Sequence, residues 1–201
     1  MQELSKRLTD YKTDTLADVW HDKVQSHSYQ YDKINIYNKK IDIPKHKIWI
    51  KTPLLKLSKP IFPPNQKFKL SMPAYAILYP NTSDIKKFYT LISKLEKKIA
   101  TFVKNIKNVK NIKSGLKVQD NTIMKSAITM LDKYPTMTLN MPFHKSGECY
   151  EFLFHVYNYN NKRMNIVNIP QGSNMIAYIE LSEVWIRENE FGFNWNILQL
   201  K

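Results

Sequence analysis

The sequence predicts a mainly β fold with inserted helices (α+β), and three observations lead to this prediction. Short runs rich in Ile, Val and Tyr, punctuated by prolines, occupy residues 34–79 and again 136–200. One long amphipathic segment, residues 83–106, lies between them. Strands do not alternate with helices as they would in a doubly wound fold. The simplest arrangement is an OB-fold-like antiparallel barrel with a long basic helix between strands 3 and 4.

Length and composition predict one domain with a preceding extension. The 201 residues, 43% of them hydrophobic and 12% aromatic, suffice for a single packed core, expected over residues 33–201. Residues 1–32 mix charges with weak helical spacing and are predicted as an N-terminal extension, either helical or mobile. The polar start, the lack of a membrane-length apolar run and the single Cys149 predict an intracellular protein of a reducing compartment, with no membrane partner.

Five short β-branched runs in the first half of this domain are predicted as strands. Prolines separate them, and proline is confined to the ends and edges of strands. The proline-rich residues 60–66 are predicted as a loop. The predicted strands are 34–37, 41–43, 46–51, 67–72 and 75–79.

Residues 83–106 form the clearest predicted helix, because apolar residues recur there at helical spacing. Asn81, Thr82 and Ser83 can each cap its N-terminus, and Asp84 suits its first turn. Lysines follow the opposite face, which we interpret as a solvated helix surface more readily than as a binding surface. These lysines are Lys86, Lys87, Lys94, Lys97, Lys98 and Lys104.

The second half is predicted to begin with a shorter helix over residues 121–133, which Pro135 ends. After this helix the β-type pattern returns, with no internal repeat and no heptad pattern. The strands predicted there are 136–141, 149–158, 163–169, 175–186 and 191–200.

Positive charge is concentrated in the middle of the chain, which indicates a polyanionic partner. Residues 33–117 contain 20 Lys and 3 acidic residues, a net charge of +17, whereas both flanking parts are slightly negative. A general bias in amino-acid composition explains why Lys outnumbers Arg 28 to 3, but it does not explain why Asp and Glu are scarce in residues 33–117. Nucleic acid is the commonest partner of such a segment.

The most informative candidate site is the strand around Trp49. Because side chains alternate along a strand, Lys47, Trp49 and Lys51 share one face, with Ile48 and Ile50 on the other. A ring between two cations suits a single nucleic-acid strand, since the ring stacks on a base and the cations contact phosphates. The alternative that Trp49 packs under a helix stays open. Lys67 and Lys69 repeat the basic face on another predicted strand.

A second candidate site lies at the predicted turn after residue 157. Tyr157 and Tyr159 stand beside Lys162 and Arg163, so a base and a phosphate could be bound together. The aromatic residues on the opposite face of the same strand are predicted to be core. They are Tyr150, Phe152 and Phe154.

No catalytic, metal or cofactor site is predicted. The five histidines lack the spacing of a metal site or a catalytic triad, and the four glycines form no phosphate-binding loop. Asp14, Asp18 and Asp22 would share one face of a helix, but acids at this spacing are usually only solvated. We therefore expect a binding protein and not an enzyme.

In the C-terminal residues 175–200, Leu181-Ser182-x-x-Trp185 precedes a short turn near residues 188–189, and Phe191-Gly192-x-x-Trp195-x-x-Leu198-Gln199 follows it. This stretch resembles the end of the single-stranded DNA-binding proteins of nucleocytoplasmic large DNA viruses. Ile169-Pro170-Gln171-Gly172 fits the family's preceding turn. The resemblance implies an OB-type fold. Gly192 indicates a bulge or a close approach of the backbone, and four glutamates make the hairpin a scaffold instead of a DNA-binding face.

Together, these observations predict a sequence-independent single-stranded DNA-binding protein for viral DNA replication, repair or recombination. Lysines would contact phosphates and aromatic rings would stack on bases. RNA binding, a homo-oligomer and a replication-protein partner stay open, as does the location among host cytoplasm, viral factory and virion. The alternative is a virion structural or genome-packaging protein that binds duplex DNA or a protein through the same basic surface.

Overall fold

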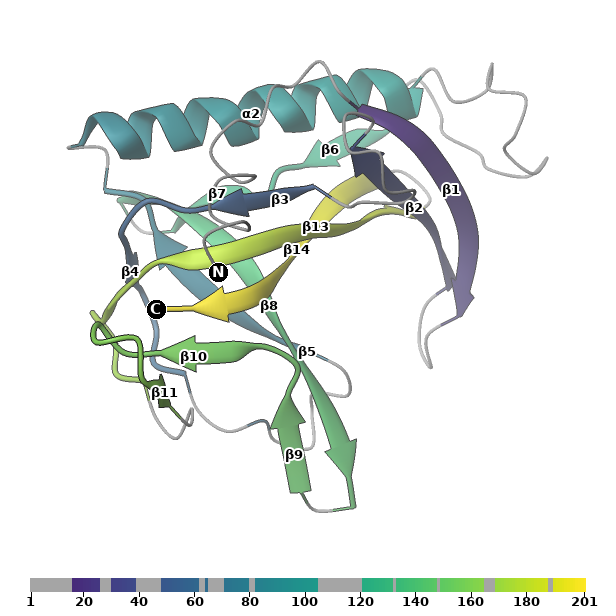
Figure 1. Ribbon diagram of the computed structural model, residues 1–201. Helices are drawn as coiled ribbons and strands as arrows, with labels where there is room; N and C mark the ends of the chain where they lie inside the picture. The colour runs from purple at the N-terminus through teal and green to yellow at the C-terminus, as the bar shows by residue number, and fades with distance from the viewer. Residues whose placement is uncertain are drawn as a thin grey trace.

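The computed structural model is a mixed β-sheet accompanied by one long helix (Figure 1). It describes residues 16–25, 30–38, 48–61, 64, 71–79, 82–104, 121–131, 133–147, 149–164, 169–187 and 190–201. The elements before the helix are β1 (Leu16–Gln25), β2 (Gln30–Asn38), β3 (Trp49–Lys51), β4 (Leu55–Leu57) and β5 (Ser71–Ile77), and the helix is α2 (Ser83–Lys104). The elements after it are β6 (Ile123–Lys125), β7 (Ile128–Leu131), β8 (Tyr134–Ser146), β9 (Cys149–Phe152), β10 (His155–Tyr157), β11 (Arg163–Met164), β12 (Asn174–Met175), β13 (Ala177–Arg187) and β14 (Glu190–Leu200).

Strand pairing connects β4, β5, β8, β14, β13 and β3 in that order. Most of these pairs are antiparallel, while β14 pairs in parallel with β8, β6 and β10. Only three residues separate β3 from β4, so one bent segment pairs first with β13 and then with β5. Thr52 holds the bend: its N–H donates to the Ala177 carbonyl at 2.8 Å, and its Oγ1 accepts from the Ala177 N–H at 2.9 Å.

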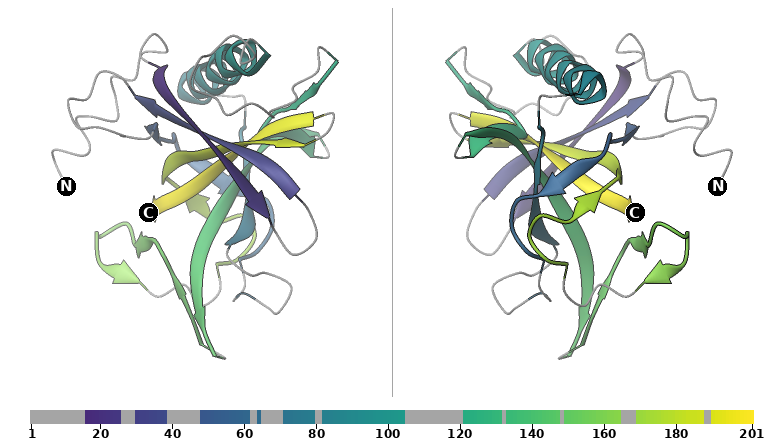
Figure 2. Two further views of the ribbon diagram at one scale, coloured as in Figure 1. Left: turned by 90° about the vertical axis from the view of Figure 1, so that its right-hand side faces the viewer. Right: turned by 90° about the vertical axis from the view of Figure 1, so that its left-hand side faces the viewer.

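The core lies on the inner side of these strands and beneath α2. Along β5 every second side chain is buried, as the period of two predicts. The helix contributes an apolar stripe at helical spacing, and both views in Figure 2 show it lying across one end of the strands. The buried residues of this stripe are Ile85, Phe88, Ile92, Leu95, Ile99 and Val103.

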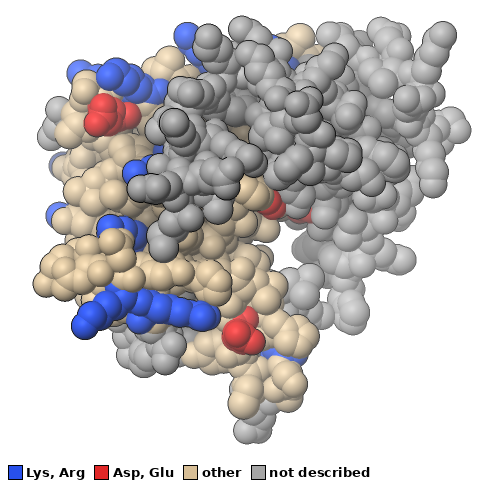
Figure 3. Space-filling view, viewed as in Figure 1, with Lys and Arg blue, Asp and Glu red and all other residues tan. Residues whose placement is uncertain are grey.

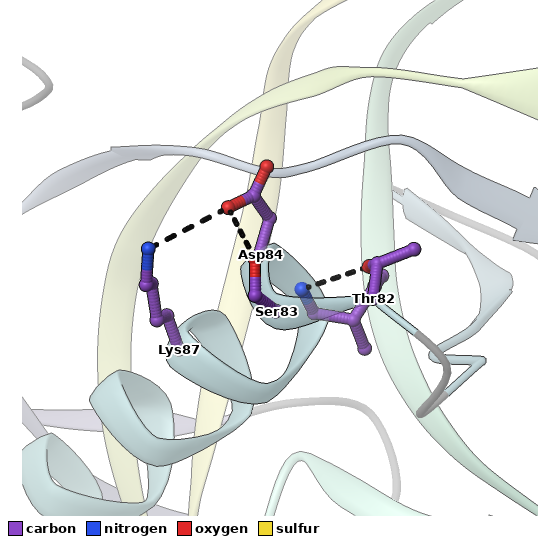
Figure 4. A network of polar contacts seen from close by, with 5 residues as sticks. Thr82, Ser83, Asp84 and Lys87 are labelled. Carbon is purple, nitrogen blue, oxygen red and sulfur yellow. Dashed lines mark hydrogen bonds and ion pairs between the residues drawn. The ribbon is translucent and has the colours of Figure 1, made fainter.

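Thr82 caps the N-terminus of α2, one of the three residues expected to be able to do so (Figure 4). Its Oγ1 accepts a hydrogen bond from the Ile85 N–H at 3.3 Å, which satisfies one of the free donors of the first turn. Asp84 lies in that turn, and its carboxylate is 3.9 Å from the Lys87 ammonium. The helix ends at Lys104, close to the predicted end at residue 106.

Four predictions of secondary structure are wrong. Residues 67–72 and 75–79 were expected to be two strands, but β5 continues from Ser71 to Ile77 through Pro73. Residues 121–133 contain the strands β6 and β7 where a helix was expected, because β7 pairs with β8 and β6 pairs with β14. The strand predicted over 149–158 is broken into β9 and β10 by a bend. The weak helical spacing near the N-terminus also led to a wrong prediction of a helix, since Leu16–Gln25 is the strand β1, paired with β2.

The order of the elements also bears on the predicted domain plan. β2 runs across the expected boundary between residues 32 and 33 and pairs with β13, so the extension and the domain meet in one sheet. Among the described residues, α2 follows five strands in the chain instead of three. The division of the chain into an extension and a domain stays a prediction.

Candidate nucleic-acid interface

The register of the sheet brings both predicted sites onto one outer face. Tyr178 of β13 lies opposite Lys51 of β3 on one side and opposite Gln199 of β14 on the other, and Gln199 lies opposite His155 of β10. Residues directly opposite each other in paired strands point to the same face. Lys51, Tyr178, Gln199 and His155 therefore form one row across four strands, which lie side by side in Figure 1.

Trp49 lies on this outer face, two residues before Lys51 in β3. Ile48 and Ile50 are buried on the opposite side, so the predicted alternation is confirmed. The ring of Trp49 is half-buried, and its Nε1–H donates to the Glu180 carboxylate at 2.8 Å. This bond satisfies the indole N–H and anchors that edge of the ring.

The turn between β10 and β11 presents the second predicted group. The Asn158 side chain accepts hydrogen bonds from the backbone N–H groups of Asn160 and Lys162, both at 3.0 Å. Asn161, whose φ of 61° is in the left-handed region, accepts a bond from the Lys201 ammonium at 2.7 Å. The turn is thus held by its own polar groups.

This ordered turn exposes the side chains expected to bind. Tyr159 at its tip is 84% exposed, and Lys162 and Arg163 are exposed beside it. Tyr157 is half-buried and contacts the His155 ring edge-on, with ring centroids 6.4 Å apart. Figure 3 shows a band of Lys and Arg side chains over β10 and β11 on this face.

Three Lys–Tyr pairs, only one of which includes a predicted residue, line the β3–β4 segment. The Lys51 ammonium lies 5.9 Å from the centroid of the Tyr178 ring. On the β5 side, Lys56 lies 5.7 Å from the Tyr79 ring and Lys59 lies 4.7 Å from the Tyr75 ring. We call Lys51, Lys56 and Lys59 with Tyr178, Tyr79 and Tyr75 the Lys–Tyr pairs.

Sequence reasoning missed Lys56, Lys59, Tyr75 and Tyr79, although a signal was present. Tyr75, Ile77 and Tyr79 alternate with buried residues, so the two rings share the outer face of β5 and its end. Lys56 lies between the buried Leu55 and Leu57 in the same way.

Three predicted residues, Lys47, Lys67 and Lys69, lie outside the described residues. Of the predicted aromatic core, Phe154 is buried and Phe152 is half-buried, but Tyr150 is 36% exposed on the β8–β9 hairpin. That hairpin projects from the end of the molecule opposite α2 in both views of Figure 2.

Several side chains of the β13–β14 hairpin contact other groups of the protein. A Cβ on Gly192 would lie 2.4 Å from a ring atom of Trp185, so the predicted close approach exists and is made by the indole. The glutamates of the hairpin bind neighbouring groups: Asn194 donates to Glu183 at 2.6 Å, and Lys125 lies 3.4 Å from Glu190. These contacts give the acidic side chains structural roles.

One buried acid lies outside this interface. Glu96 of α2 is 1% exposed and accepts hydrogen bonds from the Ser126 hydroxyl at 2.6 Å and the Ala127 N–H at 3.0 Å. Burial raises the pKa of its carboxyl, and the two bonds oppose that shift only in part. Within the described ranges, no three His, Cys, Asp or Glu residues gather as a metal site requires, and no helix has the length and apolar character to cross a membrane.

The fold of this chain is similar to that of a solved protein structure. The chain is similar to the crystal structure of gp2.5, a single-stranded DNA-binding protein encoded by bacteriophage T7. The TM-score is 0.56 and the sequence identity 10%, and the match covers 77% of this chain and 90% of that one. No family model and no curated protein sequence matches. At this identity the similarity shows that the two chains share an overall fold.

Proposed function

We propose that this protein binds single-stranded DNA without sequence specificity and serves viral DNA replication, repair or recombination. The observation that carries the proposal is the sheet register, which places Trp49 and Lys51 on the same outer face as His155 and Tyr157. The ordered turn continues this face with Tyr159, Lys162 and Arg163. The fold shared with a phage single-stranded DNA-binding protein supports the same reading.

The mechanism follows from the chemistry of these side chains. Lysine ammonium groups neutralise phosphates and release counterions, which favours binding to any sequence. Lysine acts as a point charge and lacks the bidentate geometry with which arginine reads guanine, so little base discrimination is expected. Each base that stacks on an exposed ring adds about 1–3 kcal/mol. The function is binding, with no bond made or broken in the nucleic acid.

We infer further that the strands close an OB-type barrel. In this assignment the β3–β4 segment is the first strand, and β5, β8, β13 and β14 follow as second to fifth; α2 then lies between the second and third. The pairing order and the parallel contact of β14 with β8 support it. OB barrels bind oligonucleotides on the face of strands 2 and 3. Tyr75 and Tyr79 lie on the outer side of β5 and its end, so the Lys–Tyr pairs belong to the proposed interface.

Membership of the nucleocytoplasmic large DNA virus family is part of the same proposal. The residues that resemble this family lie within β13 and β14, where Trp185 packs on Gly192. A role in replication would place the protein in the host cytoplasm or a viral factory.

Competition binding tests the proposal. A fluorescent oligo-dT bound to the protein is displaced with unlabelled oligo-dT or with duplex DNA of equal phosphate content. We expect oligo-dT to compete at least tenfold better. Equal or better competition by duplex would contradict the proposal and favour a genome-packaging role.

Two variants locate the interface in the same assay. Trp49→Ala and Tyr159→Ala should each weaken oligo-dT binding by about 1–3 kcal/mol. Tyr89→Ala is the matched control, because Tyr89 is 45% exposed on α2, away from this face. Thermal melting separates lost binding from lost folding. This matters for Trp49, whose ring is half-buried and bound to Glu180.

A further inference from the structure

The Lys59–Tyr75 pair has the closest cation-to-ring contact among the Lys–Tyr pairs. The ammonium lies 4.7 Å from the ring centroid, against 5.7 Å for Lys56 and Tyr79 and 5.9 Å for Lys51 and Tyr178. Backbone pairing explains the position of Lys59: Leu57 lies opposite Ala76, and the Ser58 N–H donates to the Tyr75 carbonyl at 2.8 Å. The two side chains are therefore held as neighbours by the sheet itself.

This geometry raises a conflict for any strand that binds here. A base needs the face of the Tyr75 ring, and in the free protein the Lys59 ammonium lies over that ring. A phosphate, in turn, needs the ammonium. A base can stack on the covered face of the Tyr75 ring only if the Lys59 ammonium moves away from it.

We propose that Lys59 and Tyr75 form an exchange pair, in which binding moves the Lys59 ammonium from the ring to a phosphate and a base takes its place on the ring. This inference rests on the proposed function and adds how the Tyr75 ring and the Lys59 ammonium become available to nucleic acid. Until a strand arrives, the ammonium covers the apolar face of the ring. The exchange then frees a cation and an aromatic surface in one step.

The relative strengths of the contacts favour the exchange. An exposed cation–π contact corresponds to a factor of about 2–5 in an equilibrium constant, whereas one stacked base corresponds to about 5–150-fold. Binding the phosphate adds the release of counterions. Both partners thus bind the strand at least as well as they bind each other.

The pair of Lys59 and Tyr75 is easier to test by mutation than the pair of Lys56 and Tyr79. The Tyr79 ring also contacts Tyr134, with ring centroids 4.9 Å apart and planes tilted by 58°. Both Tyr134 and Lys56 therefore contact the Tyr79 ring. Removal of Lys56 would leave the contact with Tyr134, so its effect on the Tyr79 ring would be harder to interpret.

Nuclear magnetic resonance on the full chain tests the exchange directly. Protons on the Lys59 side chain next to the ammonium should be shifted upfield by the Tyr75 ring current in the free protein. On addition of oligo-dT this shift should disappear. Lys59→Met assigns the signal, and Tyr75→Leu should abolish the upfield shift without DNA.

Binding measurements complete the test. Lys59→Met should reduce the slope of log K against log salt by about 0.7, the value for one phosphate on a single strand. Tyr75→Leu should weaken oligo-dT binding about 5–150-fold, while Tyr75→Phe, which keeps the ring, should bind nearly as wild type. Lys97→Met is the control, since Lys97 is exposed on α2 and should change neither quantity.

The outcomes separate the two proposals. If oligo-dT binds but the Lys59 signal stays upfield, or the salt slope of Lys59→Met equals that of wild type, the exchange is wrong and the proposed function stands. If the wild-type protein does not bind oligo-dT, the proposed function fails and the exchange fails with it. Should Tyr75→Leu not fold, the Lys59 signal and the Lys59→Met slope still decide.

Discussion

Single residues in this protein connect elements that are far apart in the chain. The Trp49 indole and the Glu180 carboxylate are 131 positions apart and meet through one hydrogen bond of 2.8 Å. Glu96 does the same inside the molecule, because its carboxylate joins α2 to the residues between β6 and β7. A buried acid with only two partners has lost much of its hydration, so its charge is costly.

At this scale we predict a stability that depends on the protonation of Glu96. Burial raises its folded-state pKa above the ordinary 4.5, so between these two values the folded chain binds more protons than the unfolded chain. The free energy of unfolding contributed by Glu96 therefore falls as the pH rises through that window. Glu96→Gln keeps an acceptor for the Ala127 N–H and removes the titration.

Urea denaturation of wild type and Glu96→Gln across this pH range measures the effect. The stability of Glu96→Gln relative to wild type should increase as the pH rises from 4.5 and then level off. A relative stability that decreases with rising pH would show that the folded protein prefers the charged carboxylate.

Among the elements, α2 depends most on its local sequence. Its stripe of apolar residues and its N-terminal cap could both be predicted from the sequence, because each depends on residues within four positions of one another. The strands β6 and β7 are the opposite case, since their apolar spacing suited a helix and only pairing with β14 and β8 made them strands.

The N-terminal cap of α2 gives the prediction at this scale. Thr82→Ala removes the acceptor of the Ile85 N–H and should lower the free energy of unfolding by about 0.5–2 kcal/mol. Ser83→Ala is the matched control, because the Ser83 hydroxyl donates to the Asp84 carboxylate at 3.4 Å (Figure 4). It should change stability by less than about 0.5 kcal/mol. Equal losses in the two variants would place the cap elsewhere.

The whole molecule is strongly basic, with a net charge of +14. The basic segment 33–117 holds three acidic residues. Asp84 is exposed beside Lys87 at the start of α2, whereas Glu96 is buried. The exposed part of the segment therefore carries fewer acidic side chains than the composition alone suggests.

The prediction for the whole molecule is a steep dependence of binding on salt. For oligo-dT, log K should fall linearly with log salt, by about 0.7 for each phosphate that a lysine neutralises. Titrations at several salt concentrations give the slope. An affinity that is unchanged between low and moderate salt would rule out lysine–phosphate contacts as the source of binding.

Features that depend on short-range order could be predicted from the sequence. The long helix was predicted because its period of 3.6 persists over six turns, and the C-terminal hairpin because two long apolar runs flank a polar turn. The alternation at Ile48, Trp49 and Ile50 was predicted for the same reason. Concentrated charge also predicted the kind of partner now proposed.

The identity of neighbouring strands depends on the packing of the whole chain, and it sets which side chains share a surface. Lys51 and His155 lie in one row because β13 and β14 stand between their strands, and no local pattern specifies that register. The pairing of β4 with β5 likewise brings Lys59 beside Tyr75. Pairing between distant segments is set by the packing of the whole core. Local periodicity therefore predicts which face of each strand is buried, but it does not predict which exposed side chains from different strands lie together.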